Sequence, residues 1–304
     1  MKGRYEPGDP RDQAHIVREA IASELEAAKR AGQVGYMARL LAQATLPHSD
    51  PKASEFQRSN GLVTLTIIAP SSVGLPYGSL PRLLLVWLTT EAVRTKERTL
   101  VLGPTLSEFM RRLELVPTGG RWGTIPRLRK QMERLFASQI QTRWEETGHS
   151  RGEKLDVARR WELWWDPKSP EQAALWKSTV TLDVEFFDEV LAHHFPVDLR
   201  ALRALRRSPM ALDIYSWLTW RMSFLAGEVT IPWPALQQQF GADYGLTRSF
   251  RHFFQRALAS VLGVYPDLRC RPYSHGRVLR ESATSVPRAV HLAGRAPASR
   301  RPPG

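Results

Sequence analysis

Two long segments of the chain carry apolar residues at the spacing of an α-helix, with basic residues between them. In the first segment the apolar residues form one stripe of a helix with about 3.6 residues per turn, and they are Ile125, Leu128, Met132, Leu135 and Phe136. In the second segment the stripe is Phe250, Phe253, Phe254, Ala257, Leu258, Val261 and Leu262. The pattern predicts two amphipathic helices, and Thr124 and Thr247 stand where a hydroxyl caps the first turn of a helix.

The side of each predicted helix opposite the apolar stripe is basic. In the first helix it consists of Arg127, Lys130, Gln131 and Arg134. In the second it consists of Arg248, Arg251, His252, Gln255 and Arg256. In a DNA major groove, Arg or Lys can donate to guanine O6 and N7, and Gln can pair with adenine. These side chains are therefore candidates for contacts with DNA bases, and Thr124 at the start of the first helix is a further candidate for DNA contact.

The elements that precede each basic helix are repeated roughly 130 residues apart. The first copy has an apolar helix at 79–96, a short strand at 99–102 and a second helix from Thr105, which has the capping-box spacing with Glu108. The second copy has its helix at 208–223, its strand at 228–231 and its next helix at 232–240. A Gly-bearing turn then leads into the long helix in both copies. Self-similarity at a fixed offset indicates two copies of one structural unit.

After the first long helix the period changes to two, which is typical of strands. Ile140, Thr142 and Trp144 alternate with polar residues, and a second alternating run contains Trp161 and Trp165. We predict a β-hairpin from these runs, with the basic segment 148–152 at its tip, and a smaller hairpin from 264–270 and 277–280. Helix, strand, helix, basic helix and hairpin is the order of a winged helix. The fold class predicted is therefore α+β, with two tandem winged-helix domains.

Composition changes along the chain place the domain boundaries. Residues 1–60 form a helical and polar N-terminal extension, and residues 282–304 form a basic tail without acidic residues that we expect to be disordered. The predicted parts between them are the first winged-helix domain at 61–182, linking helices at 183–207 and the second winged-helix domain at 208–281.

The net charge changes the picture by indicating the class of partner. The chain has 43 Lys and Arg residues and 30 Asp and Glu residues, which gives a formal net charge of +13. Such a balance favours nucleic acid or an anionic membrane surface. The longest apolar run, 83–88, is far shorter than the ~20 residues of a membrane span. The charge therefore favours nucleic acid, and the two basic helices make double-stranded DNA the expected partner.

A second group of arginines is expected to bind DNA phosphates, which positions a protein without reading sequence. These residues lie before the first basic helix, in the larger hairpin and on the linking helix: Arg121, Arg143, Arg151, Arg200, Arg203 and Arg206.

The sequence does not predict an enzyme. It has no Gly-Lys-Ser or Gly-Lys-Thr loop for nucleotide phosphates, and no His-hydrophobic-His pair of the kind that a nicking nuclease uses. His193 and His194 have no third ligand at a useful spacing, and Cys270 is the only cysteine. We expect no cofactor, no metal and no disulfide, as in a reducing cytoplasm.

Several segments together resemble the plasmid-encoded RepA replication initiators of Gram-negative bacterial plasmids. The segments are GLPYGSLPRLLL at 74–85, WLTTEA at 87–92, LSEFM at 106–110, PTGGRWGT at 117–124, DLRALRAL at 198–205, SPMALDIY at 208–215 and QFGADY at 239–244. The resemblance runs from about residue 62 to residue 279. It implies a cytoplasmic protein that binds repeated sequences, or iterons, at a plasmid origin, helps to open the duplex and brings in the host initiator and the replicative helicase. By analogy with iteron-type initiators, it also implies monomers at the origin and dimers that repress their own gene.

Two functions remain open at this point. One is the origin-binding initiator, and the other is a winged-helix transcriptional repressor without initiator activity, because tandem winged helices suit both. For either function, the doubled unit predicts a bipartite DNA site whose two major-groove segments lie about one helical turn apart.

Overall fold

A computed structural model describes most of the chain. It describes residues 27–28, 31–43, 45–61, 63–146, 149–241 and 244–286. The predictions for the start of the N-terminal extension and for most of the basic tail lie outside these residues. Within them the chain is a mixed α/β protein, and none of the described helices is long and apolar enough to cross a membrane.

The repeated unit has the same order of elements in both copies. The first copy contains α3 (Ser79–Thr95), β4 (Thr99–Gly103), α4 (Leu106–Arg112) and α5 (Thr124–Phe136). The second contains α8 (Pro209–Met222), β10 (Val229–Pro232), α9 (Trp233–Phe240) and α10 (Thr247–Val264). The predicted repeat of elements is confirmed, with bounds that differ by a residue or two.

Each copy also contains a three-stranded antiparallel sheet with the same strand order. In the first copy β4 pairs with β8 (Ser178–Leu182), which pairs with β7 (Ala158–Glu162). In the second, β10 pairs with β12 (Gly276–Leu279), which pairs with β11 (Cys270–Tyr273). The last strand of each copy therefore lies between the other two, so the repeat includes β7 and β8. A smaller hairpin is therefore present, but its first strand begins at Cys270, at the end of the predicted 264–270, and extends into the predicted turn.

The larger predicted hairpin is wrong in its pairing. Strand β5 (Gln139–Glu146) pairs with β6 (His149–Asp156), which contains most of the segment expected at the tip. Trp161 lies in β7 and pairs with Val180 of β8, in a different sheet. Strand β6 is an edge strand and is mostly exposed. It needs few apolar residues, so hydrophobic alternation gives no signal for it.

The N-terminal extension contains strands as well as helix. Strand β1 (Val34–Ala38) pairs with β9 (His194–Asp198), and it is followed by the short helix α2 (Arg39–Gln43). Strand β2 (Glu55–Ser59) pairs with β3 (Val63–Ile68), which continues into β5 and β6 as a four-stranded sheet. The extension predicted as helical and polar thus contributes to two sheets.

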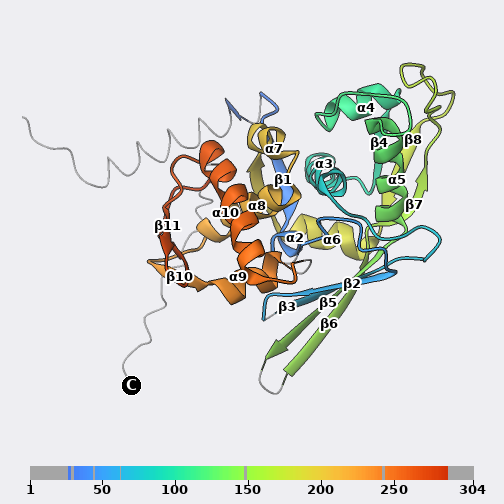
Figure 1. The fold of residues 1–304 in the computed structure, drawn as a ribbon. Coiled ribbons are helices and arrows are strands. Elements are labelled where there is room, and N and C mark those ends of the chain that lie inside the picture. The colour runs from blue at the N-terminus through green and yellow to red at the C-terminus, as the bar shows by residue number, and fades with distance from the viewer. Residues whose placement is uncertain are drawn as a thin grey trace, which may run out of the picture.

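Figure 1 shows how the elements are arranged in space. The helices α3 and α8 lie in the middle, with α7 (Leu199–Leu205) and α6 (Val184–Ala192) beside them. The helices α4 and α5 lie on one side of this group, and α9 and α10 lie on the other. The β5–β6 hairpin projects away from both. The two basic helices are thus separated by the junction between the two repeated units.

Two hydrophobic clusters form the core. The first contains Phe109, Leu128 and Leu135 from the first copy, and the second contains Phe250 and Phe254 from the second copy. Each basic helix is therefore held by the core of its own unit. Phe253 and Leu262, predicted on the apolar stripe of α10, are instead exposed at 44% and 37%, so the buried stripe is narrower than predicted.

The helix starts show where local capping rules hold. The Thr105 hydroxyl accepts a hydrogen bond from the Glu108 N–H at 3.0 Å, as the capping box predicts. The N-cap positions of α5 and α10 are instead Gly123 and Leu246. The Thr124 hydroxyl donates to the Val116 carbonyl at 2.6 Å, so Thr124 closes the loop before α5. The predictions of Thr124 and Thr247 as N-caps are wrong by one residue.

Candidate nucleic-acid interface

Helix α5 exposes two basic side chains without an acidic partner. Arg127 and Lys130 lie on its outer side, and neither forms an ion pair with another residue that the structure describes. Arg129, beside them, is engaged by Glu133 one turn later at 3.3 Å. Arg121 in the preceding loop lies over the ring of Trp122, whose side chain is 81% exposed. This end of the first unit therefore presents positive charge and an aromatic ring to solvent.

Gln131 and Arg134 do not face outward, so that prediction is wrong. The Arg134 Nε donates to the Val73 carbonyl at 3.1 Å, and its Nη1 donates to the Leu75 carbonyl at 3.1 Å and to Asp50 at 3.3 Å. The Gln131 side-chain oxygen accepts from the Tyr77 N–H at 2.9 Å. Both side chains are buried because the polar backbone of the segment before α3 packs against this part of α5. They anchor the helix.

Helix α10 exposes all of its predicted site residues. They are Arg248, Arg251, His252, Gln255 and Arg256. The Arg251 guanidinium lies 5.3 Å from the ring centre of Trp233 in α9. The Trp233 ring is buried and packs against Phe254 of α10. Cation–π contact restricts that side chain while leaving it accessible. Arg248 and Arg256 have no ion pair within the described part of the chain.

The arginines predicted to bind phosphates mostly have partners within the protein. Arg143 is ion-paired with Glu145, Arg151 with Glu153 and Arg203 with Glu114. Arg200 contacts Asp198 at 2.7 Å, and Arg206 donates to the Arg203 carbonyl at 2.7 Å. Ion pairing reduces the local positive charge that a phosphate would meet. Helices α5 and α10, in contrast, each carry exposed basic side chains that have no acidic partner among the described residues.

The loop between β7 and β8 exposes aromatic residues that sequence patterns did not assign. Trp164 and Trp176 are 51% and 64% exposed, and their ring centres lie 6.4 Å apart. Leu175 beside them is 96% exposed. The density of tryptophans was the available signal, but alternation placed Trp164 in a strand. In the repeat, this loop corresponds to the turn between β11 and β12.

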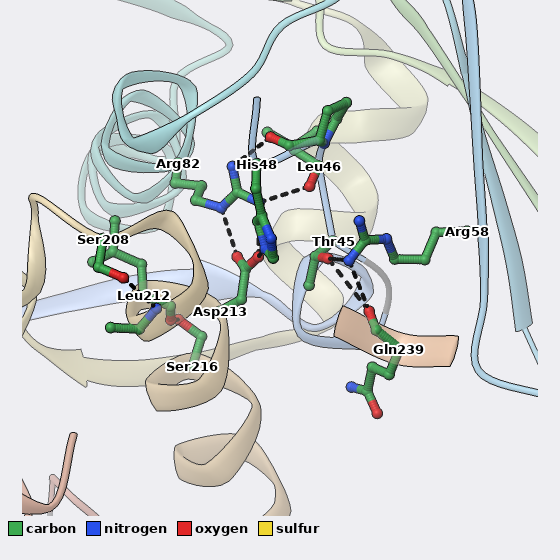
Figure 2. Close-up of polar contacts among 12 residues, drawn as sticks. Thr45, Leu46, His48, Arg58, Arg82, Ser208, Leu212, Asp213, Ser216 and Gln239 are labelled. Atoms are coloured by element: carbon green, nitrogen blue, oxygen red, sulfur yellow. Dashed lines mark hydrogen bonds and ion pairs between the residues drawn. The ribbon is translucent and has the colours of Figure 1, made fainter. Parts of the chain in front are cut away.

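A cluster of buried polar residues connects α3 of the first unit with α8 of the second (Figure 2). Arg82 of α3 forms a two-pronged ion pair with Asp213 of α8, with Nε–Oδ1 and Nη2–Oδ2 distances of 2.6 and 2.7 Å. His48 Nε2 contacts the same carboxylate at 2.8 Å. Burial by itself would raise the pKa of the Asp213 carboxyl. The charge of Arg82 and the hydrogen bonds from both partners outweigh it and hold that pKa below its usual value.

His48 is held in its neutral form. Burial lowers its pKa, and this outweighs the attraction of the Asp213 carboxylate; the charges of Arg82 and Arg58 lower it further. Its Nδ1 is buried and accepts no hydrogen bond from any described group. A protonated ring would leave a buried N–H there without a partner, which is costly.

The neutral state of His48 makes stability depend on pH. Because its folded pKa lies below 6.5, the unfolded chain binds a proton below pH 6.5 that the folded chain does not. As the pH is lowered below 6.5, we expect His48 to reduce the free energy of unfolding by up to about 1.4 kcal/mol per pH unit. Denaturant unfolding at pH 7.5 and pH 5.5 should show a smaller difference for His48→Gln than for the parent chain. His275 is exposed, so His275→Gln should leave this difference between the two pH values unchanged. If His275→Gln made the difference smaller by the same amount, the assignment to His48 would be contradicted.

Comparisons with known proteins agree with this architecture. The solved structure of domains 2 and 3 of RctB is similar to this chain, with a TM-score of 0.51 and 12% identity over 82% of this chain and 97% of that one. A second structure of the same RctB domains has a TM-score of 0.48 and 14% identity over 80% and 96%. No curated protein matches the chain. The family model described as "Plasmid encoded RepA protein" matches residues 75–233. This match spans more than half of the chain and includes α3, α4, α5 and α8. The chain therefore belongs to the plasmid-encoded RepA protein family.

Proposed function

We propose that this chain is a plasmid replication initiator that binds repeated sequences at the plasmid origin as double-stranded DNA. The observation that carries the proposal is the placement of unpaired basic side chains. Arg127 and Lys130 lie on α5, and Arg248 and Arg256 lie on α10, which are the equivalent helices of the repeated unit in a chain of the RepA family. Each helix would lie in a major groove of the same DNA molecule, so that the two units read a bipartite site.

The two units are proposed to be winged helices. Helix, strand, two further helices and two strands, with the last strand in the middle of the sheet, follow one another in both copies. Helices α4 and α5, and α9 and α10, would then form the helix-turn-helix pairs. In the first unit, β7 and β8 would be the wing, and the β5–β6 hairpin would be an insertion before it.

The exposed polar residues of the proposed interface divide into two roles. Arg127, Lys130, Arg248, Gln255 and Arg256 lie on the outer sides of the proposed recognition helices and would contact base edges. Arg121 and the paired arginines of the hairpin and of α7 would contact phosphates. A phosphate contact requires each of those paired arginines to leave or share its acidic partner.

Arg127→Ala is expected to weaken binding to the preferred site by about 1–3 kcal/mol and to relax sequence preference at one position. The reason is that a base contact discriminates, whereas a phosphate contact does not. Selection of binding sites from random duplexes, with parent and variant, measures both effects. Equal weakening across all sequences would instead assign Arg127 to a phosphate.

Other parts of the proposed role rest on the family. We propose that the protein opens the origin duplex and recruits the host initiator and the replicative helicase. We also propose that monomers act at the origin and that dimers repress the protein's own gene. No catalytic step and no cofactor is assigned to the chain in this proposal, so nucleotide hydrolysis or strand nicking by the purified protein would contradict it.

Footprinting on the DNA next to the gene, at several salt concentrations, tests the proposed function. Protection of direct repeats, with permanganate-reactive thymines in a neighbouring A·T-rich segment, is expected for an initiator. Protection of one inverted repeat over a promoter, without melting, would support a repressor of the same fold. Salt dependence is part of the test because phosphate contacts release counterions, so binding must weaken as salt rises.

A further inference from the structure

The polar cluster between the units uses every donor of one arginine. The Arg82 guanidinium donates to Asp213 through Nε and Nη2, as Figure 2 shows. Its Nη2 also donates to the Leu46 carbonyl at 2.7 Å, and its Nη1 donates to Gly78 and Pro47 at 2.6 and 3.2 Å. A guanidinium has five N–H donors in a fixed plane, and all five are satisfied. The orientation of the Arg82 side chain is therefore fixed by directional contacts.

Segment 46–50 extends this cluster to helix α5. It supplies the Leu46 and Pro47 carbonyls to Arg82 and the His48 ring to Asp213. At its other end, the Asp50 carboxylate contacts Arg134 of α5 at 3.3 Å. A continuous path of buried or half-buried polar contacts thus runs from α5 through segment 46–50 to α8. We call this path the polar junction.

A separate contact attaches the helix before α10. Arg58 of β2 donates through Nη1 to the Gln239 carbonyl at 3.1 Å and to the Thr45 hydroxyl at 2.9 Å. The Gln239 side chain donates to the Ala42 carbonyl at 3.3 Å. Gln239 lies in the last turn of α9, directly before the loop into α10. The N-terminal extension therefore contacts the second unit at the C-terminal end of α9, next to the loop that leads into α10.

Apart from the Arg82–Asp213 pair, the contacts between α3 and α8 are apolar and have less directional preference. Leu83 and Val86 of α3 pack in one cluster with Met210, Ala211 and Ile214 of α8. Apolar contacts are non-directional, so an interface made only of them can shift or rotate at small cost. A two-pronged ion pair requires one distance and one plane. The polar junction therefore determines one relative placement of the two units.

We infer that the polar junction, and Arg82 and Asp213 above all, sets the distance and rotation between α5 and α10 and so selects the spacing of the two halves of the DNA site. The two residues are positioning residues, since they are buried and cannot touch DNA in this arrangement. The inference rests on the proposed function, because it assumes that both helices contact one DNA molecule. Double-stranded DNA with two separated half-sites is the ligand whose binding it controls.

Arg82→Lys is the most informative variant. It keeps a positive charge beside Asp213 but removes the planar fork that fixes the geometry. Asp213→Glu is the second variant. It keeps a carboxylate for the ion pair with Arg82, but its side chain is longer by one methylene group, so α3 and α8 must shift relative to each other. Arg98→Lys is the matched control. Arg98 is half-buried and donates to the Leu182 carbonyl at 3.2 Å, and both residues belong to the first unit.

The test uses the full chain and a duplex that it selects from a random library. Affinity is measured for the selected spacing, for spacers changed by −2, +2 and +5 base pairs, and for one half-site alone. Two base pairs rotate the second half-site by about 70°. The parent chain and Arg98→Lys should lose roughly tenfold or more in affinity on this change, because both halves can no longer bind together. Arg82→Lys and Asp213→Glu should lose at most about threefold, or shift to another optimal spacing, with half-site affinity unchanged.

The outcomes separate the inference from the proposed function. If the chain selects no specific duplex, the proposed function fails. If it selects a bipartite duplex and both folded variants keep the parental spacing profile, the inference is overturned and the function stands. If neither variant melts cooperatively, the parent chain decides, since equal affinity for all spacings would show that nothing in the protein fixes the separation.

Discussion

Asp213→Ala is expected to lower the free energy of unfolding by about 3–5 kcal/mol. The carboxylate is 7% exposed, and it is the acidic partner of an Arg82 side chain that is itself buried. Without it, the guanidinium charge stays in the interior with only carbonyl partners, and His48 Nε2 loses its acceptor. An uncompensated buried charge costs far more than the net contribution of the intact pair.

Urea unfolding at pH 7.5, followed by tryptophan fluorescence, measures this loss. Arg82→Ala leaves a buried carboxylate and should be destabilised by a similar amount. The control is Glu133→Ala, which removes the partner of Arg129 from an ion pair with both members 49% exposed. Exposed helix pairs contribute about 0.3–0.5 kcal/mol. A loss below about 1 kcal/mol for Asp213→Ala would contradict the account of the junction.

Replacing Arg127, Lys130, Arg248 and Arg256 together by alanine is expected to lower affinity for the selected DNA by about 4 kcal/mol or more, roughly a thousandfold. All four side chains are exposed, and none has an ion pair in the described part of the chain. Folding should be retained, since surface changes of this kind alter stability by about 0.5 kcal/mol or less. Fluorescence anisotropy with a labelled duplex measures the affinity.

Pairs of substitutions test each helix separately. Arg127→Ala with Lys130→Ala removes two charges from α5, and Arg248→Ala with Arg256→Ala removes two from α10. The matched control is Arg94→Ala with Arg112→Ala. These arginines are exposed and ion-paired with Glu91 and Glu108, so the net charge changes equally. If the control pair weakens binding as much as either test pair, the effect belongs to overall charge, and the assignment of α5 and α10 fails.

The repeated unit was predictable from sequence because its signals are local. The apolar spacing of α3 and α8, the capping box at Thr105 and the basic outer faces of α5 and α10 each depend on residues a few positions apart. The exposed charges Arg127 and Lys130 belong to the same class of signal. Their exposure follows from the helical period alone.

The features that the sequence did not reveal depend on partners distant in the chain. Gln131 and Arg134 are polar residues near the edge of an apolar stripe, and only the packing of the segment before α3 buries them. Strand β6 is recognisable only once β3 and β5 provide an edge for it to extend. The alternation of apolar and polar residues does not by itself determine which neighbour an exposed strand such as β6 pairs with.

Arg82 and Asp213 are an intermediate case between local and distant signals. Their contact spans 131 positions of sequence, so no local rule predicts it. However, each is the single charged residue in the first two turns of its helix, and the two helices are equivalent in the repeat. Opposite charges at such positions of two repeated helices indicate that the helices meet, because a buried charge needs a partner.

Methylation interference on the selected duplex shows whether α5 and α10 each contact a major groove. Methylation of guanine N7 blocks a major-groove contact, so each recognition helix should produce its own cluster of interfering guanines. We expect two clusters about one helical turn apart, with one lost in the Arg127→Ala, Lys130→Ala pair and the other in the Arg248→Ala, Arg256→Ala pair. A single cluster, or two clusters that both persist in each variant pair, would contradict the reading of DNA by α5 and α10.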